Sequence, residues 1–130
     1  MAPLALLPGT RLGVYDVTLL EVAETGTFSP PAWTVHEQAA AGRDFEQTMA
    51  VITAHGDEFG KLESRWSDSD MRAEIAPWGE KMSRGAFLVA FLLSGYAAYR
   101  TQLFMYLKAC GRHELGTLNL WDGADSPKPA

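Results

Sequence analysis

The sequence has little cysteine and little positive charge. Its one cysteine, Cys110, cannot form a disulfide within the chain, so we expect a reducing, cytoplasmic compartment. Eleven Lys and Arg residues stand against sixteen Asp and Glu residues, which gives a formal net charge of −5. Because a surface that binds phosphate needs clustered Lys and Arg, this balance argues against nucleic acid as a partner.

Long apolar runs are also scarce. The longest uncharged stretch, from Gly85 to Tyr99, has 15 residues, whereas a helix that crosses a bilayer needs about 20. The apolar start of the chain lacks a basic segment and is interrupted by Pro3 and Pro8, which argues against a signal peptide. We therefore expect no membrane partner and interpret the 85–99 stretch as part of a buried core helix.

No segment alternates between apolar and polar residues for long enough to predict a sheet, so the predicted fold is all-α. A chain of 130 residues can bury one hydrophobic core. We expect a single helical domain over residues 1–130, with flexible ends at 1–9 and 123–130.

Three segments carry helical signals. The first spans residues 10–24, with Thr10 as its N-cap, and the third spans 83–109, from a Ser83 cap to a left-handed Gly111. The third helix is apolar almost all round, so we expect it to be covered on every side.

The second predicted helix runs without a break from residue 31 to residue 65. Its predicted buried seam has the helical spacings 4, 3, 4, 3 and 4 and consists of Phe45, Met49, Ile52, Gly56, Phe59 and Glu63. Residues 66–82, which contain Ser67-Asp-Ser-Asp70 and Pro77-Trp-Gly79, then predict an excursion between helices with at most one short helical turn.

Four short stretches, in the right order over about residues 10–122, resemble the DinB-like family. The sequence GYAAYRTQL, from Gly95 to Leu103, is similar to the family's closing-helix pattern His-x-x-x-His-Arg-Gly-Gln-Leu. The other three are the segment from Leu12 to Leu19, which is similar to the family's second helix, the Pro-Trp-Gly turn at Pro77, and the closing segment Leu118-Asn-Leu-Trp121.

The resemblance implies an up-down helical bundle, usually dimeric, in which three histidines hold a divalent metal. Some members use this metal to activate a low-molecular-weight thiol in transferase or isomerase reactions, and others have a damage-linked or unknown role. Here the three histidine positions fall on Thr10, Gly95 and Tyr99. Because glycine offers no ligand and threonine and tyrosine offer poor ones, we expect no metal site and no cofactor.

The three remaining histidines do not predict a replacement site. His36 and His55, on one predicted helix, would lie about 28 Å apart, and His113 follows the third helix. We interpret His36 as a surface residue and His55 with Glu58 as an exposed pair on a polar face; a two-ligand start of a metal site is the alternative for that pair.

Five residues could line a small-molecule pocket left from the metal site. Tyr96, Tyr99 and Gln102 share one side of the closing helix, and Trp78 and Trp121 could cover it. The plainer alternative is that the tyrosines are core residues and that the tryptophans clamp loops onto the core. Cys110, at a helix C-terminus, is interpreted as a structural or idle thiol.

Two functions follow. The first is a DinB-like protein without the metal, which acts as a non-catalytic small-molecule-binding or assembly module with a stress-related role. The second is a thiol S-transferase or hydrolase that works through a non-standard zinc or nickel site or through tyrosine acid/base chemistry.

We also expect a homodimer. The family's first helix has no counterpart before Leu12, and a three-helix chain would expose apolar surface that a second copy could cover, with helices 10–24 and 83–109 at the interface.

Overall fold

The computed structural model describes the backbone of residues 8–123 and the side chains of residues 14–123 except residue 16. Of the predicted flexible ends, residues 1–7 and 124–130 lie outside the described part. Pro8 and Gly9 belong to the first helix, so this helix begins before the predicted Thr10 N-cap.

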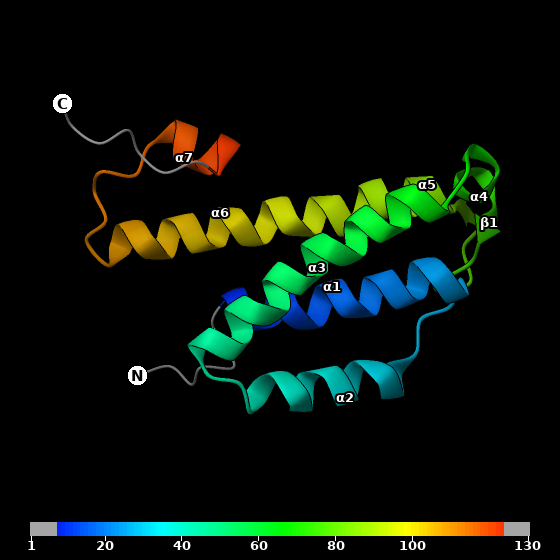
Figure 1. Ribbon diagram of the computed structural model, residues 1–130, viewed down its shortest axis with the longest axis horizontal. Helices are drawn as coiled ribbons and strands as arrows, with labels where there is room; N and C mark the ends of the chain where they lie inside the picture. Colours follow the sequence, from blue (N-terminus) through cyan, green and yellow to red (C-terminus); the bar gives the residue numbers. More distant parts are fainter. Residues whose placement is uncertain (1–7, 124–130) are drawn as a thin grey trace.

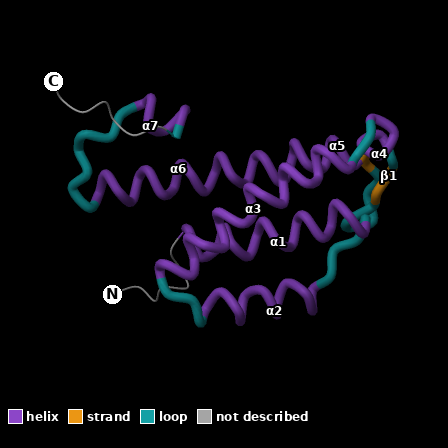
Figure 2. The backbone as a smooth tube through the Cα atoms, viewed as in Figure 1, coloured by secondary structure: helices purple, strands orange, loops and turns teal. Residues whose placement is uncertain are grey.

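The described chain is helical apart from one small hairpin, which confirms the all-α prediction in its main point (Figures 1 and 2). The elements in chain order are α1 (Pro8–Thr25), α2 (Pro30–Ala41), α3 (Phe45–Arg65), α4 (Asp68–Arg72), β1 (Glu74–Ile75), β2 (Met82–Ser83), α5 (Arg84–Phe87), the π-helical stretch η2 (Leu88–Leu93), α6 (Ser94–Ala109) and α7 (Thr117–Asp122). No described helix is both long enough and apolar enough to cross a bilayer.

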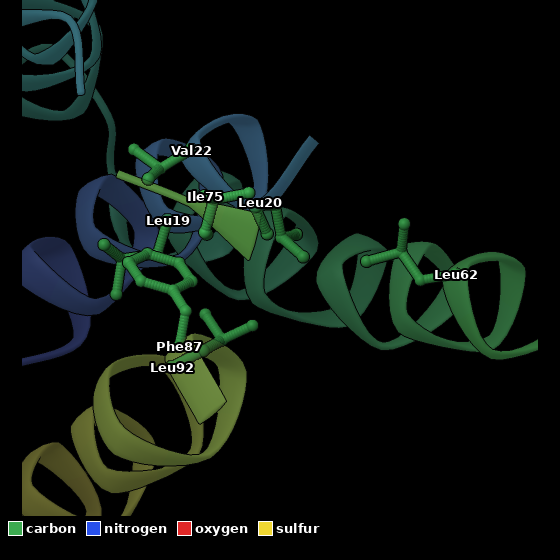
Figure 3. Close-up of a cluster of buried hydrophobic side chains, with 8 residues drawn as sticks. Leu19, Leu20, Val22, Leu62, Ile75, Phe87 and Leu92 are labelled. Carbon is green, nitrogen blue, oxygen red and sulfur yellow. The ribbon is translucent and has the colours of Figure 1, made fainter. Parts of the chain in front are cut away.

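Helix α1 lies at the centre and contacts α2, α3, η2 and α6 (Figure 1). Its buried residues are Val14, Thr18, Leu19, Leu20, Val22 and Ala23. Figure 3 shows Leu19, Leu20 and Val22 gathered with side chains from the other elements. Most of the stability of a helix in a protein comes from the packing of its apolar face, so contacts with the neighbouring helices stabilise α1.

The prediction of one continuous helix over residues 31–65 is wrong, because the chain turns between α2 and α3. Gly42 caps the end of α2, and the Asp44 side chain accepts a hydrogen bond of 2.8 Å from the Gln47 backbone N–H. The Gln47 side chain in turn accepts one of 3.0 Å from the Asp44 backbone N–H, which completes a capping box. The chain therefore has four long helical segments in its described part, and the predicted count of three is wrong.

The buried side of α3 also differs from the predicted seam. Thr48, His55 and Leu62, spaced by seven residues, are buried against the rest of the bundle. Phe45 is 74% exposed and Met49 is 45% exposed. The predicted seam flanks the buried line, and only its later part, at Phe59, packs against the core.

The segment between α3 and the long last helix is the predicted excursion, with one short helix and a hairpin that the sequence did not predict. In the hairpin, Glu74 pairs with Ser83 and Ile75 with Met82. Arg84 fastens this end to α1, because its Nε donates to the Ala23 carbonyl at 2.7 Å and its Nη1 donates to the Asp70 carbonyl at 2.8 Å.

The predicted 83–109 helix is confirmed as one run of α5, η2 and α6, with Ser83 as N-cap and Gly111 at φ 98° after its end. Its middle widens to a π-helix over Leu88–Leu93. Within one chain this helix is not covered on every side, because Val89 is 62% exposed and Leu93 is 54% exposed.

Loss of the Asp44 cap should destabilise the protein. We expect Asp44→Ala to lower the free energy of unfolding by about 0.5–2 kcal/mol, because the Gln47 backbone N–H at the start of α3 loses its side-chain acceptor. Urea denaturation followed by circular dichroism measures the change. Gln38→Ala, at an exposed position of α2, is the matched control and should alter stability by less than about 0.5 kcal/mol. Equal stability of the two variants would contradict the assignment of Asp44 as the N-cap of α3.

Candidate functional site

Helix α1 approaches α6 closely at Gly95. This glycine is buried, and a Cβ atom added to it would lie 2.0 Å from Cε1 and 2.6 Å from Cζ of Tyr15. Contacts this short do not occur between real carbon atoms, so no residue with a side chain fits here unless Tyr15 moves. Glycine at position 95 is therefore a packing requirement of this fold.

Two contacts hold the Tyr15 ring in place. Its hydroxyl donates a hydrogen bond of 2.6 Å to the carbonyl oxygen of Phe91, and its ring meets that of Tyr99 edge-on at 5.5 Å between centroids. Phe91 lies in η2, where the widened turn changes the usual hydrogen-bond ladder. The Ser94 hydroxyl bonds to another η2 carbonyl, that of Val89, at 3.0 Å. Side-chain hydroxyls thus support the backbone of the π-helical stretch.

The two positions at which the resemblance predicted helix-face histidines both face Tyr15. Gly95 gives it room, and Tyr99 packs against its ring. An imidazole at position 95 would have to point into the volume that the Tyr15 phenol fills. The third position, Thr10, lies within α1, and its side chain is outside the described part.

The residues of the predicted pocket pack against different neighbours. Tyr96 packs against Phe59 of α3 at 5.5 Å between ring centroids, whereas Tyr99 packs against Tyr15. Gln102 is exposed. The two tyrosines therefore make aromatic packing contacts, as the alternative interpretation of them as core residues predicts. That these residues bind a ligand stays a prediction.

Trp78 and Trp121 come from different parts of the molecule. Trp78, in the hairpin turn, packs on Phe91 at 4.8 Å and on Phe87 at 5.8 Å between ring centroids, so it clamps the hairpin onto the start of the long helix. Trp121 is 68% exposed on α7. Figure 1 places α7 beside the C-terminal half of α6 and the hairpin next to α5. One pocket roofed by both tryptophans does not fit this arrangement.

A small crevice lies between α1 and α2. It has a volume of about 120 Å³ and is lined by Thr18, Glu21, Val22, Thr25, Thr27, Ser29 and Ala32, none of which belongs to the predicted pocket. Near it, His36 Nε2 lies 3.0 Å from Glu21 Oε1 and ties α2 to α1. The interpretation of His36 as a plain surface residue is wrong, because its side chain is 22% exposed and has this partner.

The interpretation of His55 and Glu58 as an exposed pair is also wrong. His55 is only 4% exposed, whereas Glu58 is exposed and bonds to Lys61. Among the described side chains, those of residues 14–123 except residue 16, no group of three or more His, Cys, Asp or Glu comes together as metal ligands do.

Four exposed groups have shifted pKa values, and each owes the shift to a local hydrogen bond. The Lys61 ammonium lowers the pKa of Glu58, which in turn raises that of Lys61. The Ser67 hydroxyl lowers the pKa of Asp70, and the Arg112 guanidinium lowers that of Glu114. None of these four groups belongs to the cluster around Gly95, so their shifts supply no acid or base there.

Comparison with known proteins gives no relative. No family model, no curated protein and no solved structure matches this chain. What the site does must therefore be argued from its own geometry.

The sequence pointed to Gly95 and Tyr99 but missed the role of Tyr15. The sequence did contain a signal for this contact, namely a glycine inside a long helix at a position where the resemblance predicted a histidine. Such a glycine often marks the close approach of another segment. Which side chain makes that approach depends on how α1 packs across α6, and helical periodicity does not encode this packing.

A side chain at position 95 should be costly. We expect Gly95→Ala to lower the free energy of unfolding by about 1–3 kcal/mol, because the added Cβ overpacks against the Tyr15 ring. The matched control is Gly60→Ala, in the interior of α3 with nothing within 4 Å of the added Cβ, which should stabilise by about 0.5–1 kcal/mol. Both are measured by urea denaturation.

A double-mutant cycle identifies Tyr15 as the group in contact. In a Tyr15→Ala background the cost of Gly95→Ala should fall by at least about 0.5 kcal/mol, because the clashing ring is gone. Additive effects of the two substitutions would contradict the close packing of Tyr15 on Gly95.

Proposed function

We propose that this protein is a DinB-like helical bundle without the family's metal centre and that it acts by association and binding, not by metal-dependent catalysis. One observation carries the proposal: the ring of Tyr15 lies against Gly95 and Tyr99, the positions that correspond to two of the family's metal-binding histidines. A tyrosine fills the space that a metal and its imidazole ligands need.

The chemistry of the cluster supports this proposal. A catalytic metal site keeps an open coordination position and polar ligands around it. Here the side chains are two phenols, and the Tyr15 hydroxyl is already used in its bond to the Phe91 carbonyl. A thiol transferase or hydrolase that relied on this phenol would first have to break that bond.

A cytoplasmic location is part of the same proposal. Its support is the free, exposed thiol of Cys110, the one cysteine of the chain, which suits a reducing compartment.

Metal binding tests the proposal directly. We expect the protein, purified without chelator, to contain no stoichiometric zinc or nickel, and to bind either ion no more tightly than micromolar, because imidazole ligands are missing. Elemental analysis and isothermal titration calorimetry make the two measurements. Submicromolar binding at one ion per chain would refute the proposal in favour of the catalytic alternative.

Rebuilding the site tests the alignment with the family. Gly95→His, Tyr99→His and Thr10→His together restore the three imidazoles, but Tyr15 blocks the first of them. We therefore expect this triple variant to be destabilised, and a fourth change, Tyr15→Ala, to recover a fold that binds zinc more tightly than the triple variant does.

Tyr106→Ala, at an exposed tyrosine of α6, is the control for this fourth change and should not restore binding. Circular dichroism checks the fold of each variant. A folded quadruple variant with Tyr15→Ala that binds no zinc would show that the three positions do not correspond to the family's ligands.

A further inference from the structure

Small side chains keep the crevice between α1 and α2 open. Helix α2 lies along α1 (Figure 1). The crevice is lined by one face of α1 and by the segment that leads into α2, which together contribute Thr18, Glu21, Val22, Thr25, Thr27, Ser29 and Ala32. The large side chains of this segment pack elsewhere, because the centroid of the Phe28 ring lies 6.3 Å from those of Trp33 and Trp78. No bulky residue therefore fills the space between the two helices.

The crevice has a buried floor and an open rim. Thr18 and Val22 are each 1% exposed, whereas Thr25, Thr27 and Ser29 are exposed. Its volume of about 120 Å³ is close to that of cavities of about 150 Å³ that hold benzene. A ligand of about four to six non-hydrogen atoms therefore fits, with one end on the buried floor and the other at the rim.

The threonine hydroxyls of the crevice can only accept hydrogen bonds from a ligand, because their protons are already used. Thr18 Oγ1 donates to the Val14 carbonyl at 2.9 Å, and Thr25 Oγ1 donates to the Glu21 carbonyl at 2.8 Å. A hydroxyl that has donated its one proton keeps only acceptor lone pairs. A ligand that bonds to these oxygens must therefore supply the donors.

The Glu21 side chain adds the one formal charge among the residues that line the crevice. Its Oε1 lies 3.0 Å from His36 Nε2. A carboxylate can accept about four hydrogen bonds, so this contact leaves acceptor sites for a ligand. No Lys or Arg lines the crevice, and Arg65 of α3 is bonded to Glu24 instead. A negative site whose hydrogen-bonding groups are mostly acceptors favours a cation that donates.

The apolar part of the lining decides which kind of cation fits. Val22 and Ala32 offer no oxygen to a metal ion, and hard cations such as Mg²⁺ and Ca²⁺ need about six or more oxygen ligands. The same two side chains contact an alkyl chain favourably, because its burial removes apolar surface from water. An organic ammonium ion therefore uses both parts of the crevice, whereas an inorganic ion uses one.

We propose that the crevice between α1 and α2 binds a small primary ammonium ion with a short alkyl chain. The ammonium group donates to the Glu21 carboxylate and to the threonine oxygens, and the alkyl chain lies on Val22 and Ala32. Charge-assisted hydrogen bonds of this kind are roughly twice as strong as neutral ones. This inference goes beyond the proposed function, because the crevice shares no residue with the cluster around Gly95.

Titration with three small solutes tests the proposal on the unchanged protein. Propylammonium chloride should give saturable shifts of the backbone amide signals of the crevice residues in NMR spectra, with a dissociation constant of about 1–10 mM, as expected for so small a ligand. Propanol has the same chain without the charge, and potassium chloride has the charge without the chain. Each of these two should bind at least ~10-fold more weakly than propylammonium.

Substitutions in the crevice separate the charge from the space. Glu21→Gln removes the charge at nearly constant shape and should weaken propylammonium binding at least ~10-fold, whereas Glu37→Gln, at an exposed position of α2, should not. Ala32→Leu fills the crevice and should abolish binding, whereas Ala39→Leu, also exposed on α2, should leave it intact. Circular dichroism checks that each variant is folded.

The absence of saturable shifts at about 50 mM propylammonium would overturn the proposal. So would equal binding of propanol or of potassium, or an affinity that folded Glu21→Gln and Ala32→Leu variants both leave unchanged. The comparison of the three solutes needs no variant, so it decides even where a substitution prevents folding. None of these outcomes bears on the zinc and nickel measurements, so the crevice can fail while the metal-free site stands, and the reverse also holds.

Discussion

The fold depends on the burial of α1 among the other long helices. Thr18, Val22 and Ala23 are almost inaccessible to solvent, and they lie on a helix that α2, α3 and α6 all contact. Each of these neighbours packs part of its apolar surface against α1. Because most of the favourable energy of a small helical protein comes from such shared burial, a change in α1 affects every other element.

The contact between Tyr15 and Gly95 follows from this central position. A helix surrounded on several sides must approach its neighbours closely, and the absence of a side chain at Gly95 lets an aromatic ring lie directly on the backbone of α6. The polar hydroxyl of Tyr15 then needs an acceptor, which the π-helical stretch provides through the Phe91 carbonyl. Packing and hydrogen bonding thus favour the same rotamer of Tyr15. In this rotamer the ring leaves little room for a ligand between α1 and α6.

The same geometry explains where apolar surface remains. Helix α1 has 18 residues, and the run from α5 through α6 covers residues 84–109. A shorter central helix cannot cover both ends of a longer partner, so Leu103 and Tyr106, near the end of α6, stay 45% and 55% exposed. Helix α3 crosses toward α6 and leaves it again, which exposes Phe45 and Met49 at that same end. Exposed apolar side chains that lie near one another are typical of association surfaces.

Local chemistry in the sequence determined the helical class, the Ser83 cap, the left-handed Gly111 and the excursion after α3, because caps, glycines and helical periodicity act within a few residues. The capping box of Asp44 and Gln47 also has a local sequence signature, although it lies inside the predicted 31–65 helix. Gly95 and Tyr99 could be identified as notable positions from the resemblance. Only the tertiary structure decided that Tyr15 fills the space before Gly95, that His55 is buried and that Phe45 is exposed. These outcomes depend on how the helices cross, and a crossing brings together residues that lie 40–80 positions apart along the chain. Tyr15 and Phe91, for example, are 76 residues apart.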